Sequence, residues 1–141
     1  MPGRAIKASR RNNAKSKRKP NAQTESTVDI MFRAFSERTR LRLLHLLLDG
    51  EMCVGDLVAI LGISQPRASQ HLAYLRNAGM VARRKGGTWS YYSLAKPQSP
   101  FHKKLLECLK HCFAEVPELQ ADDRRAAKLR RDGACCPRSA D

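Results

Sequence analysis

Residues 63–94 read ISQPRASQHLAYLRNAGMVARRKGGTWSYYSL, and the fold follows from this stretch. Ser64 is a residue type that caps helix N-termini, and Pro66 suits the first helical turn, where its missing N–H costs nothing. Apolar residues then recur at the spacing of one helix face, which Gly79 closes: Ala68, Leu72, Leu75 and Ala78. The stretch therefore predicts a helix of about four turns with a polar outer face.

The second half of the stretch predicts a β-hairpin. The pair Gly86-Gly87 separates two short segments in which apolar residues alternate with other residues. Val81 lies in the first segment, and Trp89 and Tyr91 lie in the second. Glycines accommodate the positive φ that a tight hairpin turn needs. Three consecutive cations occupy the first strand: Arg83, Arg84 and Lys85.

Helices are also predicted on both sides of this stretch. Upstream, apolar spacing indicates two helices that break near residues 36–38, then a short helix over 54–61 that ends at Gly62. Downstream, residues 101–116 carry the stripe of a long amphipathic helix, and residues 118–132 can form one more. The predicted fold class is mainly α with a small β-hairpin.

The charge of the chain is concentrated at its start. The net charge is +14, and residues 1–24 hold eight Lys or Arg and no acid. This composition predicts a disordered basic arm, followed by a folded domain over 25–117 and a C-terminal helix with a cysteine-containing tail over 118–141. No apolar run reaches the roughly 18 residues of a membrane span, so we expect a cytoplasmic protein with no membrane partner.

The predicted order of helices, with a hairpin after the polar-faced helix, is that of a winged helix-turn-helix. An α-helix fits the major groove of double-stranded DNA, and a basic hairpin beside it reaches phosphates. The candidate DNA-binding residues on the helix are Ser64, Gln65, Arg67, Ser69, Gln70 and His71; on the hairpin they are Arg83, Arg84 and Lys85. No nucleophile with a nearby base, phosphate loop or carboxylate pair stands out, so an enzyme is not expected.

The segment from about Phe32 to Leu94 resembles the ArsR/SmtB family of bacterial metalloregulatory repressors. The resemblance rests on SERTRLRLLHLLLDGEMCVGDL (36–57), ISQPRASQHLAYLRNAGMV (63–81) and RRKGGTWSYYSL (83–94). It continues more loosely through residues 99–119, which look like the dimerising helix of arsenic-type members. The resemblance implies a homodimer, formed through terminal helices, that leaves operator DNA when a metal or metalloid binds.

The cysteines are the candidate inducer ligands. Arsenic and cadmium sensors of this family often carry ELCVCDL, whereas this chain has EMCVGDL, which keeps Cys53 but has Gly55 where a second thiol would stand. Trivalent arsenic or antimony favours three sulfurs. Cys108 and Cys112 share a helix face, and Cys135 and Cys136 lie beyond the last predicted helix. A three-sulfur site could therefore combine both thiols of either pair with one thiol of the other pair. Cys53 is the weaker candidate, a small residue that fills a helix start.

Other sensing chemistries stay open. Five cysteines without the spacing of a disulfide framework predict reduced thiols, and these could instead form a disulfide or persulfide switch. Zinc-sensing relatives pair ligands on the last helix, but the position where His102 would need a second ligand is occupied by Phe113, which cannot bind zinc. His111 with Cys108 and Cys112 could still hold zinc or cadmium. His45 is expected to be a packed core histidine, and a constitutive DNA-binding protein is a third possibility.

Overall fold

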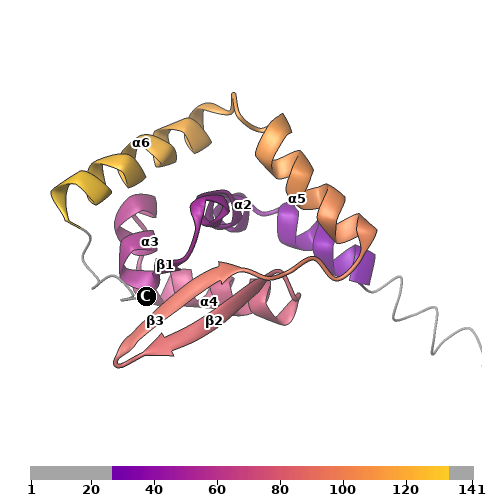
Figure 1. Cartoon of the computed structure of the whole chain (residues 1–141), viewed down its shortest axis with the longest axis horizontal. Helices are drawn as coiled ribbons and strands as arrows, with labels where there is room; N and C mark the ends of the chain where they lie inside the picture. Colours follow the sequence, from indigo (N-terminus) through magenta and orange to yellow (C-terminus); the bar gives the residue numbers. More distant parts are fainter. Residues whose placement is uncertain (1–26, 134–141) are drawn as a thin grey trace, which may run out of the picture.

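The computed structural model of the chain describes residues 27–133. The predicted basic arm and the thiols Cys135 and Cys136 lie outside this range, so the predicted division into 1–24, 25–117 and 118–141 stays a prediction. Along the chain the elements are α1 (residues 27–35), α2 (Arg38–Leu46), a 3₁₀ turn (Leu47–Asp49), β1 (Met52–Cys53), α3 (Val54–Leu61), α4 (Gln65–Asn77), β2 (Val81–Gly86), β3 (Trp89–Leu94), α5 (Pro100–Cys112) and α6 (Pro117–Asp132) (Figure 1).

Helix ends follow the local signals in the sequence. Ser64 caps α4 by accepting the N–H of Arg67 at 3.3 Å. Gly62 ends α3 in the left-handed conformation, with φ of 68°, which glycine adopts without a steric penalty. The helix-turn-helix unit of α3 and α4 therefore lies where the sequence predicts it.

The sheet has three strands rather than the predicted two, in the order β1-β3-β2, and both pairs are antiparallel. Strand β1 was missed because two residues are too short to show an alternating pattern. Only Gly87 in the hairpin turn has a positive φ, of 65°. Gly86 belongs to β2, and there a Cβ would lie 3.0 Å from the ring of Tyr91, so this position needs a small residue for space.

The last two helices differ from the prediction at one boundary. Helix α5 ends at Cys112 instead of continuing to Val116. Val116 is extended and precedes Pro117, which starts α6, and proline disfavours the helical conformation in the residue before it. The apolar stripe predicted for one long helix is therefore divided between α5 and the turn that follows it.

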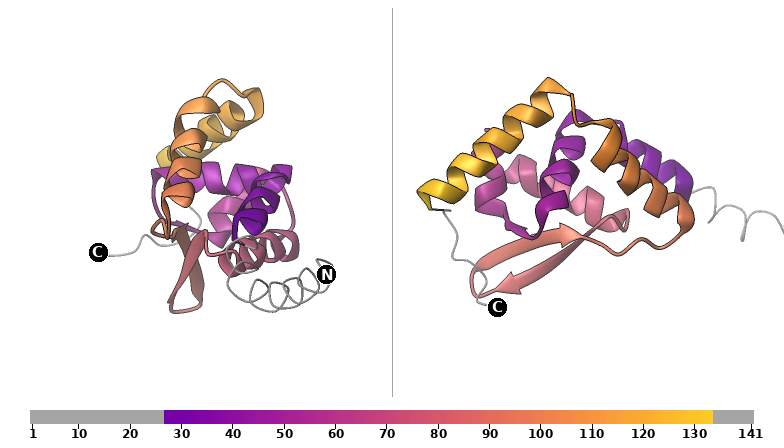
Figure 2. Two further views of the ribbon diagram at one scale, coloured as in Figure 1. Left: turned by 90° about the vertical axis from the view of Figure 1, so that its right-hand side faces the viewer. Right: turned by 45° about the horizontal axis from the view of Figure 1, so that its top comes forward.

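The core lies between α2, α3, α4 and the sheet, and the last two helices cover it from outside. Figures 1 and 2 show α6 lying over α2 and α3, while α5 runs beside α1. The rings of Phe32 and Phe101 join α1 to α5 at a centroid distance of 5.4 Å. Among the described residues no helix is both long and apolar enough to cross a membrane. The fully buried large side chains include Met31, Leu43, Leu44, Leu57, Leu72, Leu75 and Leu109.

Candidate nucleic-acid interface and thiol sites

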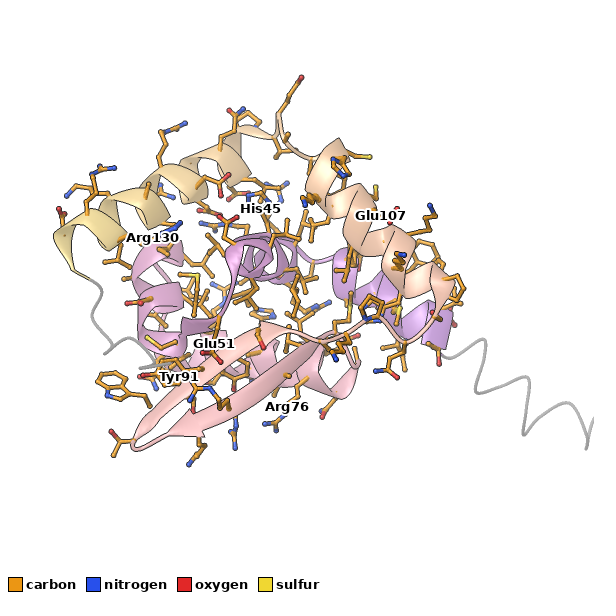
Figure 3. The ribbon with its side chains drawn as sticks, in the orientation of Figure 1. His45, Glu51, Arg76, Tyr91, Glu107 and Arg130 are labelled. Atoms are coloured by element: carbon orange, nitrogen blue, oxygen red, sulfur yellow. The ribbon has the colours of Figure 1, made fainter. Side chains whose placement is uncertain are left out.

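Helix α4 has one buried and one exposed side, as the sequence predicts. Ala68, Leu72 and Leu75 are fully buried and fix the helix on the core. Most of the candidate DNA-binding side chains point to solvent: Ser64, Gln65, Arg67, Ser69 and Gln70. The exposed Arg76, in the last turn of α4, points away from the body of the molecule (Figure 3) and adds a cation that the sequence analysis did not single out.

His71 is placed differently from its neighbours on α4. Its side chain is half-buried, and Nδ1 lies 3.8 Å from a carboxylate oxygen of Glu37 at the start of α2. Burial lowers the pKa of His71, as do the nearby Arg40 and Arg67, while Glu37 acts in the opposite direction. A neutral imidazole at pH 7 that faces α2 is suited to holding α4 in place.

The three cations of β2 point to opposite sides of the hairpin. Because strand side chains alternate, Arg83 and Lys85 share the face of Val81, which is buried in the main core. Arg84 lies on the other face, where it donates two hydrogen bonds to Glu51, at 2.8 and 3.0 Å, and stacks on Tyr91 at 4.5 Å. Figure 3 shows Glu51 and Tyr91 close together beside the hairpin. These bonds lower the pKa of Glu51. All three side chains are exposed, but Arg84, with 46% of its side chain exposed, is also paired with Glu51.

The first pair of candidate thiols is brought together on α5. Cys108 is half-buried and Cys112 is exposed, and a side-chain hydrogen bond between them raises the pKa of Cys108. The predicted i, i+4 proximity is therefore present. Within residues 27–133, however, no group of three or more His, Cys, Asp or Glu side chains is arranged to hold a metal ion. The described part of this site offers two sulfurs.

Cys53 is buried at the start of α3, with 2% of its surface exposed. Its sulfur caps the helix by accepting the N–H of Asp56 at 3.5 Å, which agrees with the structural role predicted for it. Cys53 is also disulfide-bonded. The expectation that all the thiols are reduced is wrong at this position.

His45, expected in the core, and His102, weighed as a zinc ligand, both have structural partners. Nε2 of His45 lies 2.9 Å from Asp123 of α6, so this residue links two helices. His102 is fully buried; its Nδ1 accepts the N–H of Gln98 at 3.2 Å, and burial lowers its pKa. Neither histidine lies in a cluster of metal ligands within the described range.

An exposed polar helix face after a short helix and a tight turn, beside a hairpin with exposed cations, defines a winged helix DNA-binding protein. Residues 37–83 match the family described as "Bacterial regulatory protein, arsR family". The chain is 36% identical to the arsenical resistance operon repressor of Escherichia coli K12 over 99 residues, which are 70% of this chain and 83% of the relative. The chain belongs to the ArsR family of transcriptional regulators.

Solved structures of relatives have the same fold. HlyU from Vibrio cholerae is 34% identical, with a TM-score of 0.58 over 65% of this chain and 97% of that one. The homodimeric winged helix-turn-helix domain of Mb0332 from Mycobacterium bovis, described as a possible ArsR-family regulator, is 27% identical, with a TM-score of 0.58 over 71% and 90% of the two chains. The family and these relatives are DNA-binding regulators, a class that is not enzymatic.

Proposed function

We propose that this protein is a homodimeric repressor that occupies double-stranded operator DNA and leaves it when a thiophilic metalloid or metal ion binds its cysteines. Arsenite or antimonite is the expected inducer. The observation that carries the proposal is that α5 places Cys108 and Cys112 one turn apart as free thiols, the first half-buried and the second exposed. Matched relatives named for arsenical, mercury and cadmium resistance support a soft ion as the class of ligand.

The DNA is read by α4, and the contacts divide by chemistry. The side of α4 that would enter the major groove carries four exposed polar side chains, those of Gln65, Arg67, Ser69 and Gln70. The exposed cap residue Ser64 lies at the N-terminus of the same helix. Arg83 and Lys85 bind phosphate beside the helix, because both are exposed on one face of the hairpin. His71 and Arg84, which contact Glu37 and Glu51, support these groups from behind.

Dimerisation involves the α1 and α5 side of the molecule. Phe32 is 54% exposed and lies against Phe101, and Leu105 and Phe113 are half-buried at the same side. Leu109, which belongs to the apolar stripe predicted over residues 101–116, does not contribute to this surface, because it is fully buried in the core of its own chain. An exposed large aromatic beside half-buried apolar side chains is suited to burial against a second copy.

A three-sulfur site at Cys108 and Cys112 needs one thiol from Cys135 or Cys136. Helix α6 has 16 residues, about 24 Å of rigid length, and it runs away from α5 in both figures. Within one protomer the two cysteine pairs are attached at opposite ends of this helix. We therefore expect the third sulfur to come from the tail of the second protomer.

The test measures the release of reduced protein from operator DNA. Fluorescence anisotropy of the DNA is recorded while arsenite, antimonite, cadmium, zinc or peroxide is added. Cys112→Ser, and separately Cys135→Ser with Cys136→Ser, should leave operator binding intact and abolish arsenite release. Cys53→Ser is the matched control and should still respond. A requirement for Cys53 with the other four thiols dispensable would contradict the proposed site.

Mixed dimers test whether the site crosses the protomers. A heterodimer of the Cys112→Ser chain with the Cys135→Ser, Cys136→Ser chain keeps one complete site if α5 of one protomer uses the tail of the other. It keeps none if each protomer uses its own tail. We expect the heterodimer to bind about half the arsenite of the wild-type dimer, and no binding would place the site within one chain.

A thiol-redox repressor is the second candidate, and the disulfide at Cys53 is the observation that favours it. In this case peroxide or a persulfide, and no metal ion, would dissociate the operator complex, and a reductant would restore it. Cys53→Ser would then abolish the response. The same titration of reduced protein separates the two candidates, because peroxide and not arsenite would release a purely redox sensor from the operator.

A further inference from the structure

Arg40 lies between the end of α1 and the DNA-reading helix α4. From its position in the first turn of α2, its Nη2 donates to the carbonyl of Arg33 at 2.8 Å and its Nε to the carbonyl of Ala34 at 3.3 Å. Its guanidinium also stacks over the ring of Tyr74 on α4, 4.0 Å from the ring centroid. The half-buried side chain of Arg40 therefore contacts two helices: α1, which precedes it in the chain, and α4, which follows it.

The chemistry of both contacts requires an arginine. The last carbonyls of a helix have no partner within that helix, and a cation there also interacts favourably with the helix dipole. A planar guanidinium donates in its plane and stacks on an aromatic face at the same time. Lysine would keep the charge but could not hold two carbonyls and the ring in one geometry.

The contact with Tyr74 bears on the residues proposed to read DNA. Gln70 precedes Tyr74 by four residues on α4, so the two side chains lie on neighbouring positions of the same helix side. A second contact from the start of α2, between Glu37 and His71, lies one turn away. Together these contacts fix the rotation of α4 about its own axis, which sets the direction in which Gln70 and Arg67 point.

The contact with α1 reaches the side of the molecule that carries the thiol pair. Helix α1 is anchored by Met31 and Ala34, both buried, and its Phe32 meets Phe101 of α5. Cys108 and Cys112 lie further along α5. A displacement of α5 and α1 on ligand binding would therefore move the two carbonyls that hold Arg40.

We infer that Arg40 is a positioning residue that fixes α4 against α1, so that a shift of the dimerising helices changes how the DNA-reading side chains are presented. The inference rests on the proposed function, because it assumes a sequence-specific operator and a ligand site on α5. Arg40 acts through Tyr74 and does not contact DNA itself. It thus gives the proposed repressor a physical link from the α1 and α5 pair to the recognition helix.

The test compares Arg40→Lys, Tyr74→Leu and the double variant with the control Tyr74→Phe, which keeps the aromatic ring. We expect Arg40→Lys and Tyr74→Leu each to weaken operator binding about fivefold or more, with scrambled DNA of the same length affected less than about twofold. The double variant should be no weaker than either single change, because both remove one interaction. Tyr74→Phe should bind like the wild type.

Three results would overturn the inference. The first is a loss of operator affinity in the double variant that equals the sum of the two single losses, and the second is an equal loss of affinity for operator and scrambled DNA. The third is a slope of log affinity against log salt concentration that falls by about one in Arg40→Lys, which would make Arg40 a direct phosphate contact. Thermal melting and sedimentation of each variant check that folding and dimerisation are kept. If Arg40→Lys does not fold, the exposed Tyr74 supplies the decisive variant.

The same assay separates this inference from the proposed function. Wild-type protein that does not prefer the operator over scrambled DNA would contradict the proposed function before any variant is compared. Wild-type protein that prefers the operator, with Tyr74→Leu unchanged, would overturn the role of Arg40 alone. In the variants that retain measurable binding we also expect arsenite to reduce operator affinity by a smaller factor than in the wild type, because the link to α4 is broken.

Discussion

The guanidinium of Arg42 on α2 donates two hydrogen bonds, each of 2.8 Å, to the carboxylate of Asp122 on α6. Asp122 is fully buried and also accepts a bond from Arg125 at 3.1 Å. The carboxylate of Glu118, one turn earlier on α6, contacts Arg38 at 2.7 Å and Arg42 at 3.4 Å. The C-terminal helix is thus attached to α2 by ion pairs as well as by apolar packing.

The buried pair between Arg42 and Asp122 leads to a stability prediction. Asp122→Asn removes the buried carboxylate and leaves the largely buried guanidinium of Arg42 with the more distant Glu118 as its remaining counter-charge, which should lower the free energy of unfolding by about 3 kcal/mol. Urea denaturation at pH 7 measures this. Lys128→Ala is the control, since its pair with Asp132 is exposed and should contribute less than about 1 kcal/mol. Equal effects of the two changes would contradict the importance given to burial.

The pKa of Glu118 predicts how stability depends on acid. A hydrogen bond from Arg38, with the charges of Arg42 and Arg125, holds this pKa below its ordinary value of 4.5. A carboxyl with a lowered folded pKa stabilises the protein above 4.5, and this contribution is lost as the pH falls through the folded value. In urea titrations between pH 7 and 3, Glu118→Gln should therefore lose less stability below pH 4.5 than the wild type. An unchanged acid slope would contradict this assignment.

The two faces of the hairpin predict unequal roles for its cations. Arg83→Ala or Lys85→Ala should each weaken binding to all DNA sequences and lower the slope of affinity against salt concentration by about one. Arg84→Ala should change that slope less, because Arg84 is already bound to Glu51. Anisotropy at several salt concentrations distinguishes the three variants. A loss at Arg84 as large as at Arg83 would show that the guanidinium leaves Glu51 to bind phosphate.

We expect α4 to provide sequence-specific binding and the basic arm, residues 1–24, to provide non-specific binding. Gln70→Ala should reduce discrimination against a substituted operator base by about 1–3 kcal/mol, because an exposed amide on α4 is placed to read base edges. Deletion of residues 1–24 should instead weaken operator and scrambled DNA alike and flatten the salt dependence. Competition binding measures both. Equal loss of specificity from the two changes would contradict the placement of the reading helix.

The exposed ring of Phe32 predicts the dimer surface. Phe32→Glu should shift the protein from dimer towards monomer at micromolar concentration, because it puts a charge into the surface expected to be buried. Tyr74→Glu is the control at another half-exposed aromatic and should leave the sedimentation mass unchanged. A wild-type monomer at this concentration would remove the dimer proposal. A two-fold dimer also predicts an operator that is an imperfect palindrome.

Some features could be predicted closely from sequence because their causes are local. The cap at Ser64, the proline in the first turn and the apolar spacing define α4, and the glycine turn defines the hairpin. Strand β1 could not be predicted, because its two residues are extended only through pairing with β3, about 40 residues later. The buried state of Leu109 likewise depends on neighbours that periodicity does not identify, so an apolar stripe alone did not distinguish core from dimer surface.

The sequence by itself determined the elements, the polar face of α4, the basic character of β2 and the spacing of Cys108 and Cys112, since each depends on residues a few positions apart. Tertiary structure decided which charged groups pair with one another. Arg84 and Glu51 are 33 residues apart in the chain, and Arg42 and Asp122 are 80 apart. His71 and Arg40 likewise turn inward because α2 and α4 meet. Such pairs form only when the helices and strands pack, and for this reason their roles cannot be read from local pattern.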